Sequence, residues 1–127
     1  MRLLFAVVAA LCLAGCSKSE PPQPPPTPIT KAKDPAAARE LVAAGATVID
    51  VRSAEEFSEA HLPNAVNVPV QDLPTRLSEV ATLVGGDKTR PIVVYCAAGG
   101  RAAKAKTQLD AAGYSRVING GGLDHLR

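Results

Sequence analysis

The stretch that decides the fold is Pro91-Ile92-Val93-Val94-Tyr95-Cys96-Ala97-Ala98-Gly99-Gly100-Arg101-Ala102. Its segment from Ile92 to Tyr95 is β-branched and aromatic, which is typical of a parallel strand covered on both faces. Cys96 then stands at the carboxyl end of that strand. From Ala102 to Gly113 apolar residues recur every three or four positions, which predicts an amphipathic helix ended by glycine. The stretch therefore predicts a strand, a short loop and a helix, with a cysteine at the first junction.

The loop is built from small residues. Those between Cys96 and Arg101 are Ala97, Ala98, Gly99 and Gly100. Such residues let the backbone turn its N–H groups toward one point, as anion-binding nests do. Converging donors, a helix N-terminus and a nearby cation all favour a thiolate over a thiol. An ordinary core cysteine is the alternative, because free cysteine is among the most buried residue types, but the glycine pair and Arg101 favour a reactive one.

Strands alternate with helices along the rest of the chain. Further helices are expected to begin at Asp34-Pro35, at Ser53 with Glu56 in capping-box spacing, and within 73–84. Further strands are expected over 47–51, 65–68 and 116–119. This alternation predicts an α/β fold: a mainly parallel central sheet of about five short strands, with helices on both faces and right-handed crossovers. Ligands of such sheets gather at the carboxyl ends of the strands, where Cys96 falls.

Three blocks of sequence occur in an informative order. The first comprises Val48 to Arg52, Glu55 to Phe57 and His61 to Pro69. The second is the strand and loop through Cys96 and Arg101, and the third runs from Ala111 to Leu123. Together they resemble the rhodanese family of sulfurtransferases, in its single-domain, thiosulfate sulfurtransferase-like form. The resemblance implies the three-layer rhodanese-like fold.

The resemblance also implies a reaction. Cys96 would be the catalytic nucleophile, taking a sulfane sulfur from thiosulfate or another donor as a persulfide and passing it to cyanide or a thiol. Residues 97–101 would bind the substrate, and Arg101 would close the loop and favour negative charge. Many relatives carry cationic or hydroxyl residues where this chain has only small ones: Ala97, Ala98, Gly100 and Ala102. We therefore expect thiosulfate to be a poor donor beside a persulfide or another sulfur carrier.

Charged residues of the first block are expected to support the structure. Asp50 and Arg52 flank a strand end, and we expect Arg52 to form a structural ion pair, with Glu55, Glu56 or Glu59 as candidate partners. His61 is expected to fix a loop by a hydrogen bond, and His125 to be solvated. The two histidines and Cys96 lack a nearby carboxylate cluster. We expect no metal site and no cofactor.

The N-terminus has the layout of an export signal. One positive charge at Arg2 precedes a short apolar segment, and Leu13-Ala14-Gly15-Cys16 resembles the lipobox of a bacterial lipoprotein. Residues 1–15 would be removed and Cys16 would be acylated, with palmitate among its chains, which gives stable membrane anchorage. An ordinary signal peptide and an uncleaved anchor are the alternatives. The expected location is the periplasmic side of the bacterial cell envelope.

A proline-rich tether follows over residues 16–28, with six prolines between Pro21 and Pro28. The remaining residues, 29–127, suffice for one domain with a single core. Loss of the signal and acylation of Cys16 would leave Cys96 as the only free thiol, so no intramolecular disulfide is expected. An unpaired thiol in an oxidising compartment is easiest to understand if it does chemistry.

Composition limits the partners. Removing Arg2 leaves 13 of the 14 Lys and Arg beside 12 Asp and Glu, with no basic run and no Trp. Neither phosphate-backbone binding nor base stacking is expected, so nucleic acid is excluded as a partner. The expected partners are a small-molecule sulfur donor, a thiol or cyanide acceptor and the membrane, and the expected state is a monomer.

Two other functions fit the same architecture. Tyrosine-type phosphatases and rhodanese-like cell-cycle phosphatases place five residues between cysteine and arginine, whereas this chain has four, a smaller cradle that suits a sulfur atom better. Rhodanese-like folds also serve as non-catalytic binding or redox-sensing modules. The presence of both Cys96 and Arg101 argues against a degenerate copy.

Overall fold

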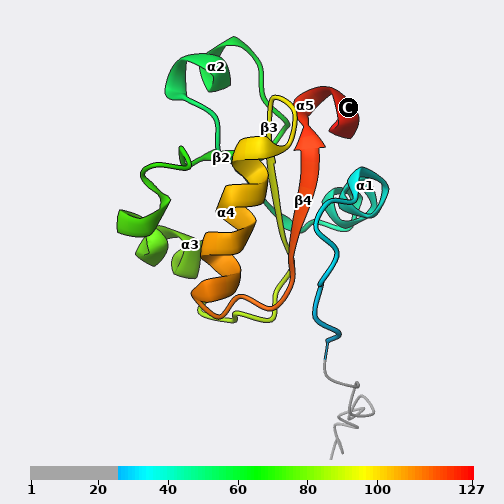
Figure 1. The fold of residues 1–127 in the computed structure, drawn as a ribbon, viewed down its shortest axis with the longest axis vertical. Coiled ribbons are helices and arrows are strands. Elements are labelled where there is room, and N and C mark those ends of the chain that lie inside the picture. Colours follow the sequence, from blue (N-terminus) through cyan, green and yellow to red (C-terminus); the bar gives the residue numbers. More distant parts are fainter. Residues whose placement is uncertain (1–25) are drawn as a thin grey trace, which may run out of the picture.

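A four-stranded parallel sheet forms the centre of the computed structural model, which describes residues 26–127 (Figure 1). Its strand order is β2-β1-β3-β4, and every neighbouring pair is parallel. The strands are β1 (Thr47–Asp50), β2 (Val66–Asn67), β3 (Ile92–Cys96) and β4 (Val117–Gly122). The α/β class is confirmed.

The strand count differs from the expected number of about five. Beyond β4, residues 29–34 cover the sheet edge but make only two backbone bonds to the segment that contains β4: Ile29 N–H donates to Ser115 O at 2.9 Å, and Asp34 N–H donates to Asn119 O at 3.0 Å. Two bonds at the ends of this segment do not make a ladder. The described part of the chain therefore has four strands and a covered edge.

Helices lie on both faces of the sheet, as predicted. The elements of one face are η1 (Leu73–Thr75), α3 (Leu77–Leu83) and α4 (Gly100–Ala111), whereas α1 (Pro35–Ala43) and α5 (Leu123–Leu126) cover the other face. A short helix, α2 (Ala54–Glu59), follows β1. The helix expected within 73–84 is divided because Arg76 leaves helical geometry between η1 and α3.

Two helix starts follow from their capping residues. The Asp34 side chain accepts a hydrogen bond from Ala37 N–H at 3.1 Å, and Pro35 occupies the first turn of α1. Ser53 and Glu56 form the reciprocal capping box of α2. Both caps confirm the predicted starts, because capping depends on residues only three positions apart.

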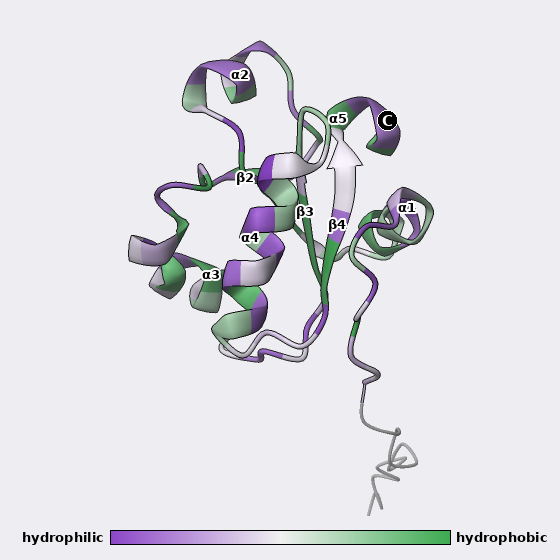
Figure 2. Ribbon diagram, in the orientation of Figure 1, coloured by the Kyte–Doolittle hydropathy of each residue, from purple (hydrophilic) through white to green (hydrophobic). Residues whose placement is uncertain are grey.

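Strand β3 ties the two halves of the core together. All five of its residues are buried, and its hydrophobic character is visible in Figure 2. Alternate residues enter opposite layers: Val93 and Tyr95 pack toward α1 and α5, whereas Val94 and Cys96 pack toward α3 and α4. Each buried large apolar side chain contributes roughly 1.5–3 kcal/mol, so a one-residue slip of β3 would be costly. The register that directs the cysteine toward α4 is thus fixed by the core.

No helix within residues 26–127 combines the length and apolar character that crossing a bilayer requires. The predicted signal over 1–15, the predicted lipidation at Cys16 and most of the tether over 16–28 lie outside the described residues. The domain boundaries, the lipid anchor and the envelope location stay predictions.

Candidate active site

Cys96 lies where β3 ends, just before the loop that leads into α4. The residue is only 1% exposed and packs against the core on the α4 side of the sheet. Gly99 N–H nevertheless donates to its Sγ at 2.9 Å. Burial raises the pKa of the Cys96 thiol. Main-chain N–H groups outweigh burial and bring the pKa below its ordinary value; these groups are those of Ala102, Ala98, Gly99 and Arg101. Gly99 N–H is thus the donor that is hydrogen-bonded to the sulfur, and the other three main-chain N–H groups lie near enough to lower the pKa of the thiol.

Gly99 shapes the loop after Cys96. Its φ of 109° lies in the left-handed region, and the residue is buried. Its carbonyl accepts from Ala103 N–H at 2.9 Å, the first bond of α4, and from Asn119 Nδ2 at 3.0 Å. Since helical geometry resumes directly after Gly99, α4 begins at Gly100, two residues before the predicted start at Ala102.

Asn119 is a supporting residue that sequence reasoning missed. It is 1% exposed in β4, and its Oδ1 accepts from Gly121 N–H at 2.9 Å while its Nδ2 holds Gly99 O. A buried amide with both ends bonded fixes the loop against the sheet. The available signal was a single polar residue inside the buried strand Val117–Gly122.

The loop also approaches β4 closely. A Cβ placed on Gly122 would collide with the carbonyl oxygen of Ala97. The register between β3 and β4 shifts between Val94 and Cys96, where this approach occurs. Glycine is therefore required at 122 to give the loop its space.

The Arg101 guanidinium binds α2. Its Nη1 donates to Glu56 Oε2 at 2.6 Å and its Nη2 to Glu56 Oε1 at 2.9 Å. The Arg101 hydrogen bonds, followed by the bond from Ser53 N–H, hold the pKa of Glu56 at about 2. The side chains of Arg101 and Glu56 are 39% and 35% exposed, so the pair lies at the surface. The main-chain N–H of Arg101 helps to lower the pKa of Cys96. Its guanidinium connects α4 to α2.

The predicted partner of Arg52 was wrong. Arg52 Nη2 lies 2.6 Å from Asp50 Oδ2, and its Nε donates to both Asp50 oxygens. Asp50 is 0% exposed and Arg52 is 7% exposed. The hydrogen bond to Asp50 raises the pKa of Arg52 despite its burial. The role as a structural ion pair holds, but the partner is Asp50, which is buried beside the guanidinium, and Glu56 pairs with Arg101.

The histidines act locally. His61 is exposed, its Nδ1 lies 2.8 Å from Phe57 O, and its ring stacks on Phe57 with centroids 3.8 Å apart. This is the expected loop-fixing bond. His125 was expected to be solvated, and its ring is exposed, but Nδ1 accepts from Gly122 N–H at 2.9 Å at the start of α5. The expected exposure of His125 is confirmed, and the hydrogen bond to Gly122 is an addition that the sequence did not indicate.

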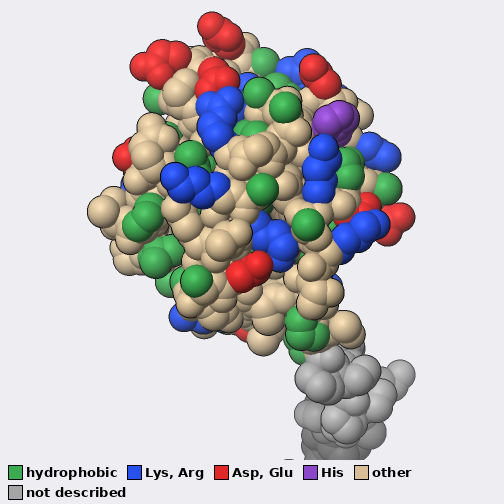
Figure 3. Space-filling model, in the orientation of Figure 1, with side chains coloured by type: hydrophobic (Ala, Val, Ile, Leu, Met, Phe, Trp, Pro, Cys, Tyr) green, Lys and Arg blue, Asp and Glu red, His purple; other side chains and the backbone are tan. Residues whose placement is uncertain are grey.

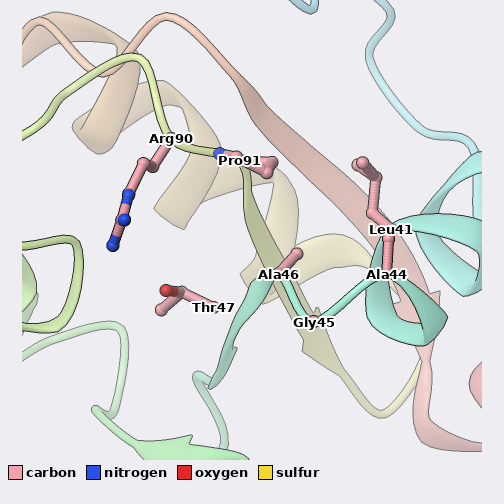
Figure 4. Close-up of a pocket in the computed structure, with 7 residues that line it drawn as sticks. All are labelled: Leu41, Ala44, Gly45, Ala46, Thr47, Arg90 and Pro91. Carbon is pink, nitrogen blue, oxygen red and sulfur yellow. The ribbon is translucent and has the colours of Figure 1, made fainter. Parts of the chain in front are cut away.

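Two pockets among the described residues lie away from Cys96. One, of about 290 Å³, is formed where β1 and β3 begin, at the opposite end of the sheet from the cysteine (Figure 4). Its lining includes one charged side chain, Arg90, and no thiol. The other, of about 430 Å³, lies between residues 29–34, α1 and the start of β4. Neither contains the nucleophile, and no group of three or more His, Cys, Asp or Glu within 26–127 is placed to hold a metal ion.

Comparison with known proteins agrees with this geometry. Residues 34–124, most of the chain, match the rhodanese-like domain family. The chain belongs to the rhodanese family. Relatives of this rhodanese include thiosulfate sulfurtransferase PspE of Escherichia coli (strain K12), 40% identical over 78 residues, which are 61% of this chain and 71% of PspE. A sulfurtransferase of Allochromatium vinosum is 33% identical over 72 residues, 57% of this chain and 62% of that protein.

Solved structures of a rhodanese and of a single-domain sulfurtransferase have a similar fold. A structure described as rhodanese with anions from E. coli has a TM-score of 0.57 and 37% identity, covering 64% of this rhodanese and 91% of that chain. The structure of the human single-domain sulfurtransferase TSTD1 has a TM-score of 0.55 and 29% identity, and the match covers 66% of this rhodanese and 84% of TSTD1. The protein is thus a rhodanese-type sulfurtransferase, as the three sequence blocks predicted.

Proposed function

We propose that this rhodanese moves a sulfane sulfur from a donor to a thiophilic acceptor through a persulfide on Cys96. The observation that carries the proposal is the buried Sγ, which accepts a hydrogen bond from Gly99 N–H and lies among main-chain N–H groups that lower the pKa of the thiol. A thiolate is the attacking species in such chemistry. The described residues contain one cysteine, so both displacements pass through the same sulfur.

The reaction has two balanced steps. The Cys96 thiolate attacks the outer sulfur of a donor such as thiosulfate; a sulfur–sulfur bond forms to Cys96, the bond inside the donor breaks, and sulfite leaves with its electron pair. Cyanide or a thiolate acceptor then attacks the terminal sulfur, and the Cys96 thiolate leaves and is regenerated. This is covalent catalysis in two displacements. The N–H groups that stabilise the thiolate also suit the negative persulfide, because they are already oriented before the reaction.

Thiocyanate formation from thiosulfate and cyanide by the full chain tests this mechanism. Cys96→Ser should lower the rate by at least about a hundredfold, since the nucleophile is lost. Cys16→Ser, the same chemical change outside the domain, should leave the rate unchanged. Mass spectrometry after donor treatment should find one added sulfur atom on Cys96. Equal rates in Cys96→Ser and the unaltered protein would refute the mechanism.

The same experiments separate the alternative functions. A Cys96 thiol that never acquires sulfur would favour a binding or redox-sensing module. Hydrolysis of an aryl phosphate without sulfur transfer would favour a phosphatase.

We also propose that the protein is held on the periplasmic side of the cell envelope by acyl chains on Cys16. The support is the sequence Leu13-Ala14-Gly15-Cys16 after a short apolar segment. Labelled palmitate should enter the unaltered protein and not Cys16→Ala, and the variant should leave the membrane fraction. Equal labelling of both proteins would contradict this proposal.

A further inference from the structure

The cation beside the sulfur is already neutralised. Arg101 is the only charged residue between Cys96 and Ala103, and both of its terminal nitrogens donate to Glu56, at 2.6 Å and 2.9 Å. Such two-bond arginine–carboxylate pairs are among the stronger charge-assisted contacts. The pair adds no net charge to the region where a donor reaches the loop.

Glu56 is held in place independently of Arg101. Its Oε2 accepts from Ser53 N–H at 3.0 Å within the capping box of α2. The hydrogen bonds from Arg101 and Ser53 keep its pKa at about 2, so the carboxylate is charged throughout the neutral range. Helix α2 carries two further acids, Glu55 and Glu59, and no Lys or Arg. Figure 3 shows acidic side chains gathered over this helix, while the Lys and Arg of that face are scattered.

The sulfur itself is stabilised by uncharged groups. The donors that lower the pKa of Cys96 are main-chain N–H groups, and the side chains of residues 97–100 carry no charge. A second negative charge on a donor therefore gains little from the loop and meets the Glu56 carboxylate that is paired with Arg101. We infer that Glu56 is a specificity-determining residue that biases the site toward sulfane-sulfur donors of low negative charge, such as thiosulfonates and organic persulfides, and against dianions such as thiosulfate. This inference rests on the sulfur transfer proposed above.

Two donors that differ in charge isolate this effect. Thiosulfate is a dianion and releases sulfite when its outer sulfur is transferred. Methanethiosulfonate is a monoanion with a methyl group in place of one oxygen, and it releases methanesulfinate by the same attack of the Cys96 thiolate. In both reactions a sulfur–sulfur bond forms to Cys96 and the sulfur–sulfur bond inside the donor breaks, and the product is the same Cys96 persulfide. Their ratio of kcat/KM therefore reports how the site treats one unit of donor charge.

The test compares this ratio in the full chain and in two variants, with cyanide as acceptor. Glu56→Gln keeps an acceptor oxygen for the capping box but frees the charge of Arg101. At an effective dielectric constant of about 40, one unit charge about 6 Å away changes a rate ratio about tenfold. The ratio of thiosulfate to methanethiosulfonate should therefore rise about tenfold at low salt, and less at high salt. Glu59→Gln removes the same charge from the same helix without contacting Arg101, and it should change the ratio far less.

A second measurement does not depend on turnover. Iodoacetate and iodoacetamide alkylate thiolates in the same way, but only iodoacetate is charged, and both reactions can be followed on the peptide that contains Cys96. Glu56→Gln should raise the ratio of the iodoacetate rate to the iodoacetamide rate several-fold, a change that a merely structural role of Glu56 would not produce.

The outcomes are distinguishable. Sulfur transfer with unchanged ratios in Glu56→Gln, or equal rises in Glu56→Gln and Glu59→Gln, would overturn the inference while leaving the proposed function intact. Absence of transfer from both donors would refute the proposed function, and this inference with it.

Discussion

The buried pair of Asp50 and Arg52 predicts a large loss of stability when its charge balance is broken. Asp50 is 0% exposed and accepts four hydrogen bonds from Arg52, one from its main chain and three from its guanidinium. Asp50→Asn keeps the side-chain volume, so no cavity forms, but it leaves the Arg52 guanidinium in the interior without a counter-ion. Removing one partner of a buried pair costs about 3–5 kcal/mol, whereas exposed pairs contribute about 0–1 kcal/mol.

The loss should be visible in both chemical and thermal unfolding. For a domain of this size each kcal/mol lowers Tm by about 4–8 °C, so a loss of about 3 kcal/mol corresponds to a fall of at least about 12 °C. Urea unfolding followed by circular dichroism gives the free energy of unfolding, and a thermal scan gives Tm. Asp87→Asn, at an exposed turn where Asp87 accepts from Thr89, makes the same chemical change and should have little effect.

A second change separates the stranded charge from the lost hydrogen bonds. Adding Arg52→Met to Asp50→Asn removes the unpaired cation, so it should restore part of the lost free energy. A loss below about 1 kcal/mol in Asp50→Asn, or further destabilisation on adding Arg52→Met, would refute the reasoning, because each would show that Arg52 is not desolvated.

Three further predictions concern the loop. Because main-chain donors lower the pKa of Cys96, the thiolate should persist at pH values where free cysteine, with a pKa of about 8.5, is already protonated. The rate of reaction with iodoacetamide should therefore fall at a lower pH than for free cysteine. A midpoint of this pH profile equal to or above that of free cysteine would contradict the prediction. Asn119→Asp keeps the acceptor for Gly121 but replaces the donor to Gly99 O with a carboxylate oxygen, so it should lower Tm and raise the Cys96 midpoint; an unmoved midpoint would show that Asn119 does not position the loop. Gly122→Ala should slow sulfur transfer at least about tenfold, because the new methyl group displaces the carbonyl of Ala97; a wild-type rate in thiocyanate formation would contradict the close approach.

The parts of the fold that were predictable depend on neighbours in sequence. The apolar segment from Ile92 to Tyr95 and the caps at Asp34 and Ser53 are complete within a few residues, so their patterns were sufficient. The end of β4 was not predictable in this way. Residues 120–122 are all glycine, which has low strand propensity, and tertiary packing holds them in the strand. The loop after β3 packs against Gly121 and Gly122, and Leu126 packs against Gly120.

The same distinction applies to the candidate site: its local parts were predictable and its long-range contacts were not. Cys96 and its loop were recognisable because the small residues, the cysteine and the arginine are consecutive. The contacts that hold the loop join residues far apart: Arg101 and Glu56 are 45 positions apart, and Asn119 and Gly99 are 20 positions apart. Arg52 is a different case, because its partner Asp50 is only two positions away, nearer than the glutamates that were expected to pair with it. Tertiary packing brings Glu56 to Arg101, whereas the choice of Asp50 over the glutamates follows from the burial of Asp50 and Arg52 side by side.

The covered edge of β4 has a consequence for how the domain is presented. Ile29 bonds beside the beginning of β4, whereas Cys96 lies at the far end of the parallel neighbour β3 (Figure 1). The segment before Ile29 therefore joins the domain at the end of the sheet opposite the sulfur. An attachment at this end would keep the carboxyl ends of the strands, where Cys96 lies, away from the point of attachment. The covered edge of β4 is also protected from pairing with the sheet of another copy.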